Sequence, residues 1–172
     1  RGRGVAVAGG GLGAVAYPGE DRDRRLDLFF DTAARHGLAA GFHADETMDP
    51  AAESRRAIAA SVARTGFDAP VVAGHCCSLS TQDAARALDT LDLVAKAGIH
   101  VVSLPMCNLY LQDRHAGRTP RGRGVTLVHE MKARGIPISF ASDNTRDPFY
   151  AYGDLDMLEV MRQATRIAHL DH

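Results

Sequence analysis

The chain has only three cysteines in its 172 residues, Cys76, Cys77 and Cys107. They form no C-x-x-C pair, and adjacent cysteines do not readily bridge each other, so we expect neither a disulfide framework nor a structural zinc knuckle. The expected compartment is therefore a reducing cytoplasm.

An excess of one charge and long apolar runs are also lacking. Twenty Lys and Arg stand against 21 Asp and Glu, which does not suit a general nucleic-acid binder. No stretch approaches the roughly 18 apolar residues of a membrane span, and the opening RGRGVAVAGG lacks the apolar core of a signal peptide. We therefore expect a soluble cytoplasmic protein whose partner is a small molecule, not nucleic acid or a membrane.

With 45% hydrophobic and 24% charged residues, the chain can bury a core as a single domain over residues 1–172. Short apolar runs alternate with helical patterns, and glycine marks several helix ends. The predicted strands cover residues 38–43, 70–74, 100–104 and 137–141, with one or two earlier strands within 5–16. The predicted helices cover residues 26–36, 50–64, 81–97, 125–134 and 155–169, and a loop spans 113–124. The strands are continuously apolar, as parallel strands covered on both faces should be.

Polar residues suited to metal chemistry follow these strands. His43 and Glu46 end the run AAGFHADE, His75 ends VVAGH, Asn108 ends VVSLPMCN and Asp143 follows ISFAS. In a strand–helix barrel the carboxyl ends of all strands meet at one mouth, whereas an open sheet usually concentrates ligand contacts at one switch point. We therefore predict an α/β fold, a (β/α)8 TIM barrel. Such a barrel needs about 250 residues, and the chain begins at Arg1, so we expect its C-terminal part, without the first strands.

A rival motif lies near the start, where Gly9, Gly11 and Ala14 satisfy the dinucleotide-type pattern G-x-G-x-x-G/A. That fingerprint needs a helix directly after the glycines. The following Val15–Pro18 indicates a strand and then a break. A flexible connection before a strand is the preferred interpretation.

The surroundings of His43 favour chemistry over a role in the core. Asp45 and Glu46 crowd the same strand end, which is costly unless a cation or a proton transfer uses them. His75 and Asp143 repeat the arrangement on later strands. Two neutral imidazoles and a carboxylate suit Zn²⁺ or Fe²⁺ better than magnesium or calcium.

Five segments in this order, HADET, GHCCS, LPMCNLYLQDR, TPRGRGVT and SDNTRDPFYAYGD, resemble the cytosine deaminase branch of the amidohydrolase superfamily. The resemblance runs from about Leu26 to the C-terminus. It implies an amidohydrolase-type barrel in which His43 is the fifth-strand metal ligand and Asp143 the eighth-strand ligand. It also implies that Glu46 is the proton shuttle and that His75 orients the attacking water.

The chain departs from that family in two ways. The H-x-H pair that supplies two metal ligands on the first strand is absent, in agreement with the missing first strands. Asn144 stands where the cytosine enzyme has a second aspartate, and an amide both donates and accepts hydrogen bonds. The substrate is then cytosine or a relative such as isocytosine, a creatinine-like ring or an aminotriazine. Phe149, near the ring by the same resemblance, and Gln112 and Asn108, at the end of the seventh strand, are predicted to shape the pocket.

The predicted function is metal-dependent hydrolytic deamination of a small nitrogen heterocycle, with Glu46, His75 and Asp143 as catalytic residues and one Fe²⁺ or Zn²⁺ ion. Two alternatives stay open: an amidohydrolase that cleaves a cyclic amide or an N-alkylamino-triazine, and a non-catalytic barrel fragment. A homo-oligomer is expected, because exposed strand edges favour pairing.

Other residues receive plainer interpretations. Cys76 and Cys77 are expected to be packing residues. The arginines of residues 113–124 are expected to belong to a solvated loop. Asp147 either caps the turn after the last strand or contacts substrate.

Overall fold

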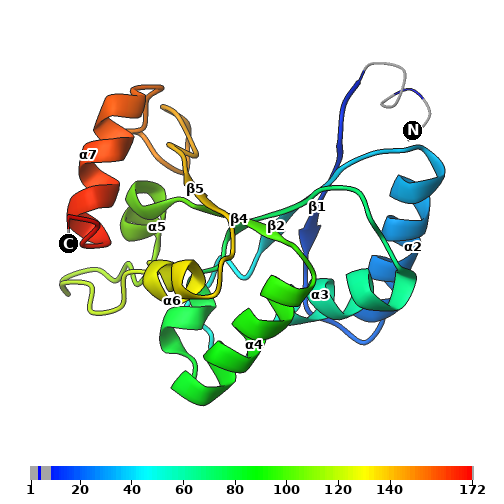
Figure 1. Cartoon of the computed structure of the whole chain (residues 1–172). Helices are drawn as coiled ribbons and strands as arrows, with labels where there is room; N and C mark the ends of the chain where they lie inside the picture. Colours follow the sequence, from blue (N-terminus) through cyan, green and yellow to red (C-terminus); the bar gives the residue numbers. More distant parts are fainter. Residues whose placement is uncertain (1–3, 5–8, 172) are drawn as a thin grey trace.

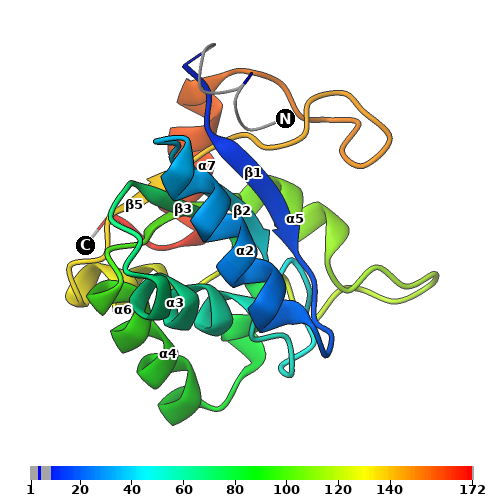
Figure 2. The ribbon, with the colours of Figure 1, turned by 90° about the vertical axis from the view of Figure 1, so that its right-hand side faces the viewer.

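The computed structural model describes residue 4 and residues 9–171 of the chain. Five parallel strands form one sheet in chain order: β1 (Leu12–Ala16), β2 (Ala40–Ala44), β3 (Val71–His75), β4 (His100–Ser103) and β5 (Ile138–Phe140). Figure 2 looks onto β1, which is one edge of the sheet. The strand order never reverses, so the sheet has no switch point of the doubly wound kind. Consecutive neighbouring strands are the arrangement of a (β/α) barrel, which confirms the predicted fold class.

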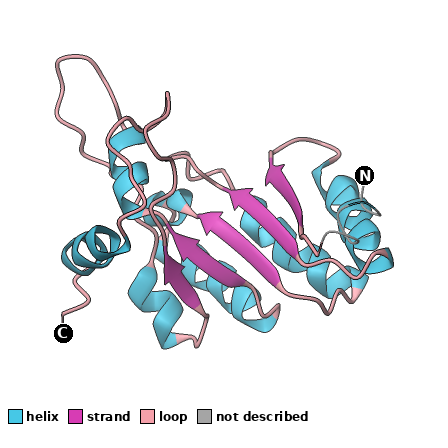
Figure 3. Ribbon diagram, turned by 90° about the horizontal axis from the view of Figure 1, so that it is seen from above, coloured by secondary structure: helices cyan, strands magenta, loops and turns pink. Residues whose placement is uncertain are grey.

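Helices lie between the strands and after the last one: α2 (Arg22–Arg35), α3 (Ser54–Thr65), α4 (Ala84–Lys96), α5 (Pro105–Leu111), α6 (Val128–Ala133) and α7 (Met157–Ile167), with a 3₁₀ turn η1 (Cys77–Thr81). Of these, α2, α3, α4 and α6 pack in sequence against one face of the sheet (Figures 1 and 3). Among the described residues, no helix combines the length and the apolar character that crossing a membrane requires.

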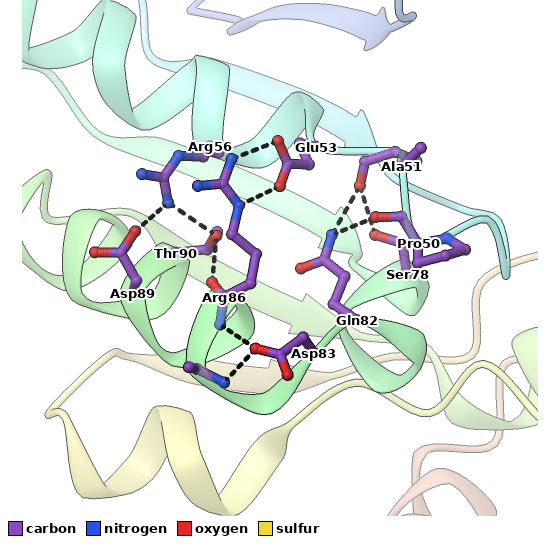
Figure 4. A network of polar contacts seen from close by, with 12 residues as sticks. Pro50, Ala51, Glu53, Arg56, Ser78, Gln82, Asp83, Arg86, Asp89 and Thr90 are labelled. Atoms are coloured by element: carbon purple, nitrogen blue, oxygen red, sulfur yellow. Dashed lines mark hydrogen bonds and ion pairs between the residues drawn. The ribbon is translucent and has the colours of Figure 1, made fainter.

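Local chemistry explains where the helices begin and end. The Asp83 side chain accepts hydrogen bonds from the backbone N–H groups of Ala85 and Arg86 and so caps α4. Gly66 ends α3 in the left-handed conformation with φ 65°, which glycine adopts without strain. Figure 4 shows the polar contacts between α3 and α4, in which Glu53 pairs with Arg86.

The two faces of the sheet differ. In β2, Ala40, Phe42 and Ala44 are buried against the helices, whereas Gly41 and His43 lie on the opposite face. The opposite face lines a hollow of about 640 Å³, with His43 and His75 at its border. In the described residues the helices cover one face of the sheet, and the other face opens toward the hollow.

Two predictions concern residues 5–16, namely an early strand and a dinucleotide-type motif. β1 follows the glycine run directly and α2 begins only at Arg22, so no helix follows the glycines and the dinucleotide motif has no structural support. β1 lies within the range predicted for the early strands, and residues 5–8 of that range lie outside the described residues.

The sequence pattern missed α5, which follows β4 at once. Pro105 occupies the first turn of this helix, where its fixed φ and missing N–H are tolerated. Asn108 therefore lies on a helix, and Gln112 at its C-terminal end, not at the end of a strand as expected. The helices predicted at 50–64 and 81–97 were also too long, because they begin at Ser54 and Ala84.

Candidate metal and proton-transfer site

His43 and His75 come together at the carboxyl ends of neighbouring strands. His43 Nδ1 and His75 Nε2 are 2.8 Å apart. His43 pairs with Gly74 across the sheet, while His75 pairs with Ala44, whose side chain faces the helices. His75 nevertheless reaches His43, because its backbone leaves the strand in the left-handed region, with φ 68°. Such strained backbone recurs at functional sites, where the surrounding structure holds it in place.

Glu46 and Asn108 complete one side of this cluster. Glu46 Oε1 lies 3.4 Å from His75 Nδ1, and the Asn108 Nδ2 atom lies 3.2 Å from the same ring nitrogen. Potential ligand atoms of His43, Glu46 and His75 all lie within 4.8 Å of one another, close enough to share one cation. The structure thus brings together four of the residues that the sequence pointed to.

Asp143 approaches the cluster from the loop after β5. Its Oδ2 atom lies 3.8 Å from His75 Nδ1, too far for a hydrogen bond. The atom is buried and has no hydrogen-bond partner among the described residues. A buried carboxylate oxygen is costly in that state unless a cation satisfies it, so this orphaned atom fits a metal ligand. Like His75, Asp143 has a left-handed backbone, with φ 68°.

Burial and neighbouring charge shift the protonation of the two central groups in opposite directions. Burial, with the charge of Asp143 as a second cause, raises the pKa of Glu46 to about 7. Burial also lowers the pKa of His75 to about 4, and the neighbouring His43 acts in the same direction. A carboxyl group that exchanges its proton near neutrality beside a neutral imidazole is suited to acid–base catalysis.

Of the remaining predicted substrate-binding residues, two lie at the edge of the cluster and one lies away from it. Gln112 donates from its amide to the backbone oxygen of Glu46 over 3.4 Å, at the edge of the cluster. The Asn144 oxygen accepts from the Cys107 thiol, and its amide nitrogen donates to Asp147. Phe149 is 63% exposed and has no described contact with the cluster. Gln112 and Asn144 therefore border the site, whereas Phe149 lies on an exposed turn.

Asp147 caps that turn. One of its carboxylate oxygens accepts from the backbone N–H groups of Phe149 and Tyr150 at 3.0 and 2.9 Å, and the other accepts from Asn144. Of the two interpretations left open for Asp147, the structure supports the cap.

Sequence reasoning missed the pair formed by Asp45 and Arg55. Asp45 lies between His43 and Glu46, and its carboxylate accepts from the backbone N–H groups of Ser54 and Arg55 and from the Arg55 guanidinium. The Asp45 backbone oxygen accepts from Cys77 and Ser78, in the loop after β3. This residue therefore ties the segment that carries Glu46 to the start of α3 and to the 3₁₀ turn η1, which follows His75 closely. The sequence signal was an acid beside a predicted ligand, but Asp45 is satisfied by Ser54 and Arg55, so the expectation that a cation or a proton transfer uses it is wrong.

The three cysteines are buried and unpaired. Burial raises the pKa of Cys76 to about 11 and that of Cys107 to about 12, so both thiols stay protonated at neutral pH. This agrees with packing roles for Cys76 and Cys77. In the basic loop, Asp113 accepts from Arg118 and from the backbone of Arg121 and Gly122, so the loop is folded around an acid of its own.

Comparisons with known proteins place this geometry in a family. Residues 4–171 match the model described as amidohydrolase family. The chain therefore belongs to the amidohydrolase family, whose members depend on metal, and the resemblance drawn from the five sequence segments is confirmed.

Particular relatives narrow the comparison. Over 168 residues the chain is 60% identical to a pterin deaminase of Rhizobium rhizogenes (strain K84), covering 98% of this chain and 38% of that protein. The structure of 5-methylcytosine deaminase from Klebsiella pneumoniae, liganded with 5-fluorocytosine, matches with a TM-score of 0.86 and 28% identity, covering 98% of this chain and 41% of that one.

A second structure, N-isopropylammelide isopropylaminohydrolase from Burkholderia multivorans, matches with a TM-score of 0.66 and 23% identity, over 93% of this chain and 38% of that one. This likeness supports the fold alone. The chain thus spans about two fifths of the length of the relatives described here.

Proposed function

We propose that the protein is a metal-dependent hydrolytic deaminase of a small nitrogen heterocycle, with a fused aminopyrimidine of the pterin type as its preferred substrate class. The observation that carries the proposal is the cluster of His43, His75 and Glu46 beside the orphaned carboxylate oxygen of Asp143. This set combines metal ligands with a proton donor of suitable pKa at one mouth of the barrel.

In this proposal, His43 and Asp143 hold the metal from this part of the chain. One imidazole and one carboxylate suit zinc or ferrous iron. A bound divalent ion of this kind lowers the pKa of its water from 15.7 to about 7, so that hydroxide is available at neutral pH.

The remaining residues handle protons. Asp143 accepts the proton that the attacking water loses. Neutral Glu46 protonates the ring nitrogen next to the carbon that bears the amino group, while the water oxygen bonds to that carbon. Glu46 then takes the proton of the new hydroxyl group and passes it to the amino nitrogen, and the proton held by Asp143 returns to Glu46. The carbon–nitrogen bond breaks, ammonia leaves and the ring carbon keeps a carbonyl oxygen. The resemblance assigns the orientation of the attacking water to His75, but both of its ring nitrogens contact protein groups, His43 and Asn108, so its role in this proposal is to hold His43 in place.

The pterin-type ring is preferred because of the high identity to the pterin deaminase of R. rhizogenes. The aminopyrimidine half of a pterin has the amidine-type carbon–nitrogen bond of isocytosine. The Asn144 amide can hydrogen-bond to such a ring, since one N–H and one oxygen lone pair remain unused besides its bonds to Cys107 and Asp147. Gln112 and Phe149 remain proposed contacts at the rim.

Cytosine is the second candidate, supported by the match to 5-methylcytosine deaminase. The pocket around Glu46 decides between the two rings by its size and by the hydrogen bonds that Asn144 offers.

An ammonia-release screen tests the proposal. The product of the complete coding region, loaded with Zn²⁺ or Fe²⁺, is assayed against pterin, isocytosine, cytosine, creatinine and an aminotriazine. We expect release from pterin to exceed release from cytosine by at least tenfold in kcat/KM. Ammonia from cytosine alone would move the assignment to the second candidate, and no ammonia from any ring, with metal bound, would refute the deaminase.

A further inference from the structure

Asn108 closes a chain of hydrogen bonds that begins at His43. His43 Nδ1 and His75 Nε2 are 2.8 Å apart, and His75 Nδ1 lies 3.2 Å from the Asn108 amide nitrogen. The same amide nitrogen lies 3.5 Å from Oε1 of Glu46. Asn108 is only 1% exposed, so these partners and not bulk water determine how its carboxamide is oriented.

The direction of this chain depends on which end of the carboxamide faces His75. A neutral imidazole has one N–H, so each ring donates at one nitrogen and accepts at the other. With the amide nitrogen toward His75, Asn108 donates to Nδ1 and His75 donates from Nε2 to His43 Nδ1. The proton of His43 then lies on Nε2.

With the carbonyl oxygen toward His75, every bond reverses. His75 donates from Nδ1 to Asn108, and His43 donates from Nδ1 to His75 Nε2. Because His43 Nδ1 is occupied by His75, only Nε2 is available to a metal ion. His43 Nε2 keeps a free lone pair only when His75 donates from Nδ1 to Asn108 and His43 donates from Nδ1 to His75. Metal-ligating histidines generally donate from their other ring nitrogen to such an outer partner.

We propose that Asn108 is a positioning residue. Its carboxamide sets the direction of the hydrogen bonds that run through His75, and this direction decides whether His43 offers the lone pair of Nε2 to a divalent ion. The inference rests on the proposed function in one respect, namely that His43 holds the metal. A half-turn of the carboxamide exchanges its oxygen and nitrogen with little change of shape, so the backbone of α5 need not move.

Two substitutions separate the two directions. N108D keeps the shape and, in its ionised form, presents only acceptors, and therefore holds the hydrogen bonds in the metal-binding direction. N108L keeps the approximate volume and removes both polar ends. T126V is the matched control, because Thr126 is also buried, at 4% exposure, and its hydroxyl has no partner in the described part of the chain.

The measurements use the product of the complete coding region and need no substrate. Zinc affinity is measured by competition with a chromogenic chelator, and the tautomer of His75 by ¹⁵N NMR of labelled histidine. We expect N108L to bind zinc 10- to 100-fold more weakly, the range typical of a lost outer partner. We expect N108D to bind zinc at least as tightly as the wild type, and its His75 to have the proton on Nδ1 even without zinc. T126V should match the wild type.

Several results would overturn the inference. These are an N108L variant that binds zinc within threefold of the wild type, or an N108D variant whose His75 keeps its proton on Nε2. If N108L fails to fold, the NMR result for N108D decides the question. A wild-type protein that binds no zinc would refute this inference and the proposed function together. Expected tautomers without ammonia release would count against the deaminase alone.

Discussion

Removal of the Asp45 carboxylate should strongly destabilise the protein, because it leaves a buried guanidinium without its counter-charge. The side chains of Arg55 and Asp45 are 1% and 2% exposed, and Arg55 Nη2 lies 3.3 Å from Asp45 Oδ2. Breaking a buried ion pair by removing one partner costs about 3–5 kcal/mol. The backbone N–H groups of Ser54 and Arg55 also lose their acceptors, at about 1 kcal/mol each.

We therefore expect Asp45→Ala to lower the free energy of unfolding by about 5–7 kcal/mol, a large part of the 5–15 kcal/mol typical of a folded protein. Chemical denaturation followed by circular dichroism measures this change. The exposed pair of Arg56 and Asp89 is the matched control. Asp89 is 58% exposed, so Asp89→Ala should cost less than about 1 kcal/mol.

A double variant tests the cause. In Asp45→Ala with Arg55→Met the unpaired charge is gone, so the double variant should be less destabilised than the sum of the two single variants by about 2 kcal/mol. Strict additivity, or a cost of Asp45→Ala no greater than that of Asp89→Ala, would refute the argument that burial of the pair matters.

Three further outcomes are expected at the site. Glu46→Gln should keep the metal but lower kcat by about 10²- to 10⁴-fold in the ammonia assay, and turnover within tenfold of wild type would refute its role as proton shuttle. Asp143→Asn should weaken zinc binding in chelator competition by more than the 10- to 100-fold typical of a lost outer partner, and unchanged affinity would remove it from the ligand set. In metal-stripped protein, the raised pKa of Glu46, about 7 against 4.5, means that its contribution to stability is lost as pH rises from 4.5 to 7. The lowered pKa of His75, about 4 against 6.5, means that its contribution is lost as pH falls from 6.5 to 4. Denaturation across this range should therefore show stability rising with pH in Glu46→Gln and falling with pH in His75→Gln, and equal slopes would contradict the two shifts.

Much of the fold could be predicted from local pattern. The alternation of apolar runs with helical segments predicted the strands and most of the helices, because a helix that buries one face has a periodic apolar pattern, whereas a buried strand is a short apolar run. His43, His75 and Asp143 could be grouped from the sequence because parallel strands of a barrel end at one mouth.

Tertiary structure alone decided the arrangement within the site. The left-handed backbone of His75 turns its ring toward His43, and no local pattern encodes that turn. Asn108 was expected at a strand end but lies on α5, from which its amide reaches His75. Asp45 depends on Arg55, ten residues away, and on a loop that follows another strand. Such contacts join segments distant in sequence, and they form because burial leaves polar groups that must find partners, wherever the fold places them.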